Sequence, residues 1–99
     1  AIVAASDQLA LGALFWLHEH GVRVPDDVSV SGYDGIADTA YYWPPLTTMA
    51  VDFPRMGRST VHALLALQGV GGPPDLGMPV AELVPRASTG RPGGGLSSP

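Results

Sequence analysis

The feature that most constrains the fold is the order of patterns at the start of the chain, where two apolar runs flank a helix-forming stretch. Residues 1–5 are apolar and end at Ser6, which predicts a strand buried on both faces. Residues 7–20 lack proline and stop before Gly21, which predicts a helix that Ser6 caps. Residues 28–31 alternate and lead into a glycine-rich turn. This order is typical of a βαβ unit with parallel strands.

The remaining sequence predicts two more extended segments and a second helix. Residues 46–51 indicate a third strand, and Asp52 can cap a helix that follows it. Residues 78–86 indicate a last extended segment, where Pro85 predicts that the second half lies at an edge of the sheet or outside its ladder. From Ser88 onward the composition is typical of a flexible tail. The fold class predicted from these patterns is α/β.

Composition narrows the classes of function. The net charge is −4 and lysine is absent, which argues against a nucleic-acid-binding surface within this stretch. The absence of cysteine excludes disulfides and thiolate metal sites. No apolar run approaches the ~20 residues that a membrane helix needs, so we expect no membrane partner. The chain opens on an apolar strand without an initiator Met, and we therefore expect the true N-terminus to lie upstream.

The sequence carries no catalytic or phosphate-binding signature, such as a nucleophile elbow or a Walker loop. Ser6, Asp7 and His62 could form a triad in principle, but nothing in their spacing favours it. His18 and His20 point about 200 degrees apart on a helix and cannot share a metal ion. We therefore expect no enzyme activity, no cofactor and no metal.

Asp34 is the strongest candidate for a ligand contact. It lies between two glycines at the carboxyl end of a predicted parallel strand, where ligands bind in open α/β sheets. Capping of a turn is an equally good explanation of this aspartate. Phe53 follows the third strand and could offer a flat face to a sugar ring, although a phenylalanine near an element boundary more often belongs to the core.

The first predicted helix has almost no polar face before His18. A helix that packs on one sheet needs only a single apolar stripe, so its second face must be covered. Another layer of a larger protein could cover it, and so could a second subunit.

Four separated blocks resemble the lactose-repressor family of bacterial transcription regulators. They are residues 4–13 (AASDQLALGA), 24–34 (VPDDVSVSGYD), 44–48 (PPLTT) and 82–89 (ELVPRAST). The resemblance implies the C-terminal part of an effector-binding core with a periplasmic-binding-protein-like fold, in which two lobes with helix-flanked parallel sheets surround a cleft. Residues 1–49 and 81–89 would belong to the C-terminal lobe and residues 52–77 to the N-terminal lobe, with residues 90–99 as a flexible tail.

The family resemblance also implies a function. A cytoplasmic regulator would bind a small effector, expected to be a sugar, and control operator DNA through a helix-turn-helix domain absent from this chain. Asp34 and Ser6 would be polar ligand contacts, and Phe53 would line the pocket. A homodimer would form through Leu9, Ala13, Trp16 and Tyr42. The alternative is a periplasmic sugar-binding protein of a transport system, because such proteins share the architecture.

Overall fold

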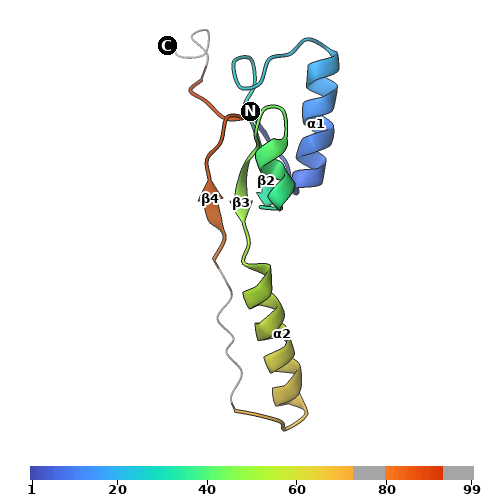
Figure 1. Ribbon diagram of the computed structural model, residues 1–99, viewed down its shortest axis with the longest axis vertical. Coiled ribbons are helices and arrows are strands. Elements are labelled where there is room, and N and C mark those ends of the chain that lie inside the picture. Colours follow the sequence, from blue (N-terminus) through green and yellow to red (C-terminus); the bar gives the residue numbers. More distant parts are fainter. Residues whose placement is uncertain (73–79, 93–99) are drawn as a thin grey trace. The chain divides into compact units, whose positions relative to one another are not determined.

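The computed structural model describes residues 1–72 and 80–92, whose helices and strands are shown in Figure 1. The chain divides into two compact units, Ala1–Ala50 with the chain from Glu82 onward, and Val51–Ala81. Two residues of the expected last extended segment, 78–79, lie outside the described residues, as do residues 93–99 of the expected tail. The assignment of residues to lobes stays a prediction.

A four-stranded sheet organises the first unit. Its strands are β1 (Ile2–Val3), β2 (Val30–Asp34), β3 (Thr47–Ala50) and β4 (Glu82–Val84), in the order β1-β2-β3-β4. The first three strands are parallel and β4 is antiparallel to β3. Pro85 follows the last paired residue of β4, which confirms that it lies outside the ladder. The mixed sheet confirms the α/β class.

The expectation that the first strand is buried on both faces is wrong. Only Ile2 and Val3 pair with β2, and Val3 is 84% exposed. The physical reason is position, because β1 is the edge strand of the sheet and no described element covers its faces. An apolar run of this length does not distinguish an edge strand from a central one.

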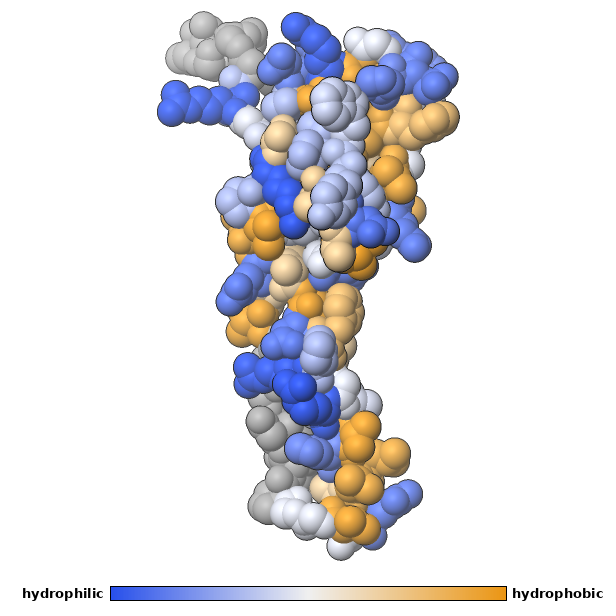
Figure 2. Space-filling view, in the orientation of Figure 1, coloured by the Kyte–Doolittle hydropathy of each residue, from blue (hydrophilic) through white to orange (hydrophobic). Residues whose placement is uncertain are grey.

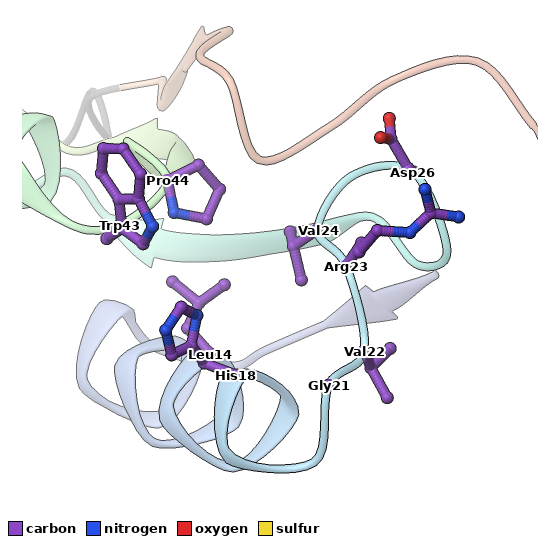
Figure 3. Close-up of a pocket in the computed structure, with 9 residues that line it drawn as sticks. All are labelled: Leu14, His18, Gly21, Val22, Arg23, Val24, Asp26, Trp43 and Pro44. Atoms are coloured by element: carbon purple, nitrogen blue, oxygen red, sulfur yellow. The ribbon is translucent and has the colours of Figure 1, made fainter.

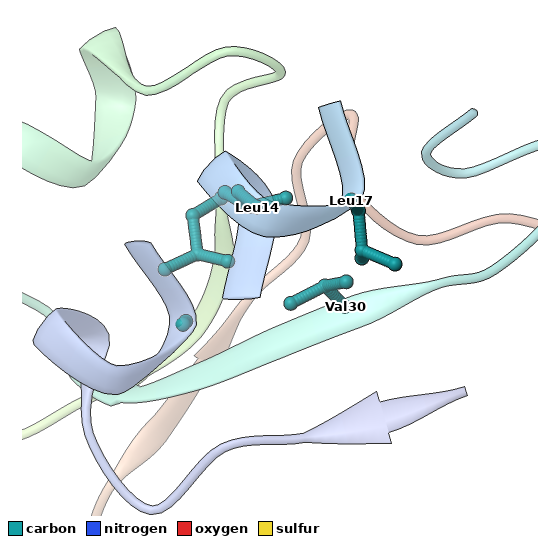
Figure 4. Close-up of a cluster of buried hydrophobic side chains, with 5 residues drawn as sticks. Leu14, Leu17 and Val30 are labelled. Atoms are coloured by element: carbon teal, nitrogen blue, oxygen red, sulfur yellow. The ribbon is translucent and has the colours of Figure 1, made fainter. Parts of the chain in front are cut away.

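Helix α1 (Asp7–Glu19) packs on the sheet and begins and ends as its sequence predicts. Ser6 Oγ accepts a hydrogen bond from Leu9 N at 3.2 Å, and Gly21 adopts a left-handed φ of 69° after the helix. The buried core that α1 forms with β2 and the residue before β3 is shown in Figure 4 and comprises Ala10, Leu14, Leu17, Val30 and Leu46. The buried positions of α1 recur every three or four residues, so they form one face.

The expectation of a tail from Ser88 onward is also wrong at its first residues. Ser88 is fully buried, and its hydroxyl donates to the carbonyl of Val30 and accepts from Thr47 N. Thr89 shares a hydrogen bond with Thr47 at 2.7 Å. Small polar side chains stabilise the sheet here because they satisfy backbone groups at the amino ends of β2 and β3.

The described part of the second unit consists mainly of helix α2 (Phe53–Leu67). Asp52 caps it as predicted, since its carboxylate accepts a hydrogen bond from Arg55 N at 3.0 Å. Neither α1 nor α2 is long and apolar enough to cross a bilayer, and the described ranges contain no other α-helix.

Candidate functional site

Asp34 ends β2, and its backbone conformation is unusual. It pairs with Ala50 at the carboxyl ends of two parallel strands and has a φ of 122°. A non-glycine residue held at such an angle costs on the order of 1–3 kcal/mol and persists only where its surroundings fix it. Gly35 follows with a φ of 78°, and a Cβ there would lie 2.5 Å from the Ala50 Cα. The turn after β2 therefore requires glycine at position 35 and places Asp34 at its start.

The turn is fixed by the carboxylate of Asp7, which is fully buried at the first position of α1. Its Oδ2 accepts hydrogen bonds from Gly35 N at 2.8 Å and from Ile36 N at 2.9 Å. Its Oδ1 accepts a hydrogen bond from the Thr48 hydroxyl at 2.6 Å. Three donors and the positive end of the helix dipole compensate the burial of this acid. We call Asp7, Gly35, Ile36 and Thr48 the Asp7 cluster.

Sequence reasoning missed the contacts of Asp7, because it considered this residue only as a member of a triad that its spacing did not favour. The available signal was topological. An acid that directly follows one parallel strand lies at the same sheet edge as the residues that follow the neighbouring strand. Gly32 was a second signal, since a Cβ at that position would collide with Asp7 Oδ1.

A short 3-10 helix, η1 (Ala37–Tyr41), continues the loop after the Asp7 cluster. The buried Thr39 donates its hydroxyl to the carbonyl of Ile36 at 2.6 Å and accepts from the Arg86 guanidinium at 2.6 Å. Arg86 also donates to the carbonyl of Leu46 at 2.9 Å. These bonds join the loop to the segment after β4. The backbone of the loop is thus held by Asp7 at its start and by Arg86 farther along.

The side chain of Asp34 differs from that of Asp7 in its contacts. It is half-buried, and within residues 1–72 and 80–92 it makes no side-chain hydrogen bond and no ion pair. A carboxylate offers two oxygens, each able to accept from more than one donor. The Asp34 carboxylate can therefore accept hydrogen bonds from two neighbouring hydroxyl groups of a ligand.

The other two predicted ligand contacts lie in different surroundings. Ser6 is half-buried, directly precedes Asp7 and uses its oxygen to cap α1, which leaves its hydroxyl hydrogen available as a donor. Phe53 begins α2 in the second unit and is 47% exposed. The structure therefore places Asp34 and Ser6 in one unit and Phe53 in the other.

The outward face of α1 carries large apolar side chains. Leu9 is 62% exposed and Trp16 is 56% exposed, while Ala13 is half-buried. Hydrophobic side chains are visible over this helix in Figure 2. Tyr42 is half-buried and packs against the core rather than standing free. Three of the predicted interface residues thus lie on α1, and the fourth follows η1.

Burial raises the pKa of the Tyr42 phenol, and the charges of Asp7 and Asp38 raise it further. The proton is held because the deprotonated phenol would lose solvation and would add a third negative charge to this region. The pKa of Tyr42 therefore depends both on its burial beside the core and on the negative charge of Asp7.

A pocket of about 420 Å³ lies beside the end of α1. In Figure 3, Leu14 and His18 face it from the helix, the loop at Gly21–Val24 borders it, and Trp43 and Pro44 close the opposite side. None of the three predicted ligand contacts lines it.

The histidines at the end of α1 were considered above as metal ligands. The ring of His20 stacks on Trp16, with ring centroids 3.8 Å apart. No group of three metal-ligating side chains occurs in the described part of the chain.

Comparisons with known proteins agree with this architecture. A family model described as a periplasmic binding protein-like domain matches residues 1–89. The chain is 43% identical over 100 residues to the lactose operon repressor of Escherichia coli K12, across 100% of this chain and 28% of that protein. It thus spans little more than a quarter of the length of that relative.

Two solved structures illustrate the likeness in three dimensions. The lac repressor dimer bound to operator and the anti-inducer ONPF superimposes with a TM-score of 0.75 at 44% identity, over 88% of this chain and 30% of that one. A LacI-type transcription regulator from Bifidobacterium animalis subsp. lactis superimposes with a TM-score of 0.78 at 36% identity, over 91% of this chain and 32% of that one. These relatives are regulators and do not favour the transport alternative. The chain belongs to the periplasmic-binding-protein-like domain family, and its resemblance to the lactose-repressor (LacI) family of transcription regulators is confirmed.

Proposed function

We propose that this chain is part of the effector-binding core of a transcription regulator that recognises a small polyhydroxylated molecule, most simply a sugar. The observation that carries the proposal is Asp34, whose half-buried carboxylate lies at the carboxyl end of β2 and has no side-chain partner among the residues that the structure describes. Hydrogen bonds to a charged acceptor contribute about 1.5–3 kcal/mol, so one carboxylate that binds two hydroxyls is a strong determinant of affinity.

Ser6 and Phe53 are the further contacts that we propose. Ser6 supports this role because it lies next to the Asp7 cluster and retains a hydroxyl hydrogen to donate. Phe53 supports it through its exposed ring, which offers an apolar face of the kind that packs on the C–H face of a sugar. The participation of Phe53 rests on the family resemblance, because it belongs to the second unit.

The proposed regulator acts in the cytoplasm as a homodimer and binds operator DNA through a helix-turn-helix domain outside residues 1–99. The exposed apolar face of α1 supports the dimer, because such a face is stabilised when a second copy covers it. A two-fold dimer presents two DNA-reading domains at a fixed spacing, which is what a palindromic operator requires.

The proposal is tested on the full-length protein with DNA selected from a random duplex library. Fluorescence anisotropy would measure affinity for the selected DNA with and without D-glucose, D-galactose, D-xylose, lactose and maltose. At least one sugar should change the DNA affinity by 5-fold or more, the usual scale of allosteric coupling. Failure of the protein to select any DNA sequence contradicts the regulator role, whereas selection without any sugar response contradicts the effector class.

A further inference from the structure

We propose that Asp7 is a positioning residue for effector recognition, acting through the backbone that follows Asp34. This inference rests on the proposed function, since it assumes that Asp34 contacts the effector. It begins from a contrast between two acids at one sheet edge. Asp7 is fully buried and takes three hydrogen bonds, whereas Asp34 is half-buried and has no side-chain partner in the described ranges.

The Asp7 cluster fixes the two peptide units directly after Asp34. One oxygen of Asp7 binds the consecutive amides of Gly35 and Ile36, so both N–H groups must point toward α1. Consecutive amides that converge on one anion form a concave nest with little conformational freedom. The φ of 122° at Asp34 is therefore imposed by contacts of its neighbours and not by contacts of its own side chain.

The second oxygen of Asp7 anchors the cluster to the neighbouring strand through Thr48. Gly32 leaves the room that this carboxylate needs, since a side chain there would occupy the position of Oδ1 and would lie 2.9 Å from Leu46. Helix α1, β2 and β3 are thus joined at one point beside the candidate ligand contact. Asp7 is suited to this role because a short carboxylate at the first helical position reaches both strands.

The experiment compares Asp7→Asn with Ser88→Ala in the full-length protein. Ser88 is the matched control, because it is also fully buried and also bonds β2 and β3, but at their amino ends. Hydrogen exchange read by mass spectrometry would follow the amides of Gly35 and Ile36. Calorimetric titration with D-glucose, D-galactose, D-xylose, lactose and maltose would measure effector affinity.

We expect Asp7→Asn to accelerate exchange at Gly35 and Ile36 at least 10-fold and to weaken binding of the recognised sugar at least 10-fold. Ser88→Ala should leave both within 2-fold while it lowers thermal stability. In an Asp34→Asn background, Asp7→Asn should change affinity less than 2-fold, because its effect passes through Asp34. If Asp7→Asn does not fold, Ile36→Pro removes one donor to Asp7 at a φ of −64°, which proline accepts. It should accelerate exchange at the remaining amide of Gly35 and weaken binding of the recognised sugar to the same degree.

Equal affinity losses in Asp7→Asn and Ser88→Ala would overturn the inference, since a merely structural role predicts them. Unchanged exchange at Gly35 and Ile36 would overturn it as well. If Asp34→Asn weakens binding but neither Asp7→Asn nor Ile36→Pro does, the positioning role fails and the proposed function stands. If no sugar binds, or Asp34→Asn leaves binding unchanged, the proposed contact fails, and the role of Asp7 in recognition fails with it whatever the exchange rates show.

Discussion

The hydroxyl of Ser88 accepts a hydrogen bond from the backbone amide of Thr47 at 2.8 Å, although 41 residues separate them. The same hydroxyl donates to the carbonyl of Val30, and Val30 N donates to the carbonyl of Ser88 at 2.9 Å. The segment after β4 therefore closes the amino ends of β2 and β3.

Replacement of Ser88 by alanine should destabilise the fold by about 1–3 kcal/mol, because the buried amide of Thr47 would lose its acceptor. Urea unfolding of the full-length protein would measure the loss. Ser88→Thr keeps the hydroxyl and should therefore be less disruptive. A change below 0.5 kcal/mol in Ser88→Ala would show that water or a neighbouring group replaces the hydroxyl.

Gly35→Ala should destabilise the protein by more than about 2 kcal/mol, because a Cβ would lie 2.5 Å from the Ala50 Cα and the φ of 78° disfavours alanine. Gly12→Ala provides the comparison, since nothing lies within 4 Å of a Cβ there and alanine favours helix. Thermal unfolding would rank the two variants. Equal stability of both would contradict the close approach of β3 to the turn.

The outward face of α1 should be the dimer contact. Trp16→Glu is expected to weaken dimerisation by at least about 2 kcal/mol, because a charge would enter an apolar interface. Val61→Glu is the control, since Val61 on α2 is 53% exposed and Trp16 is 56% exposed. Sedimentation velocity at micromolar concentration should then show monomers for Trp16→Glu and dimers for Val61→Glu. A Trp16→Glu protein that remains dimeric would place the interface elsewhere.

Alkaline pH should destabilise the fold partly through Tyr42. Burial, followed by Asp7 and Asp38, raises the pKa of this phenol above its ordinary value of 10.0. The folded protein thus holds the proton more tightly than the unfolded chain does, and the contribution of Tyr42 is complete below pH 10 and is lost as the pH rises through the folded pKa. Tyr42→Phe should show a shallower loss of unfolding free energy above pH 10. Identical alkaline slopes for both proteins would contradict the raised pKa.

Much of the fold follows from local sequence signals. Ser6 and Asp52 cap the helices that their positions predict, and Gly21 adopts the left-handed conformation expected after α1. Each of these features depends on residues within one or two helical turns, so a single sequence contains the information.

The contacts that the sequence did not predict all join distant segments. Asp7 bonds residues 28 and 29 positions away, and Ser88 bonds a residue 58 positions away. Composition indicated a tail at Ser88 because serine and threonine occur both in tails and as buried hydroxyls. The exposure of Val3 was missed for a related reason, since strand order in the sheet depends on long-range pairing. The ligand contact at Asp34 stays a prediction, based on its place at the end of β2.

Calorimetric titration of the recognised sugar into the wild-type protein and Asp34→Asn tests the central claim most directly. The substitution keeps the shape of the side chain but removes its charge and one acceptor. We predict a dissociation constant that rises about 10-fold or more, in line with 1.5–3 kcal/mol per lost hydrogen bond to a charged group, while affinity for DNA without effector stays the same. An unchanged sugar affinity in Asp34→Asn would contradict the account.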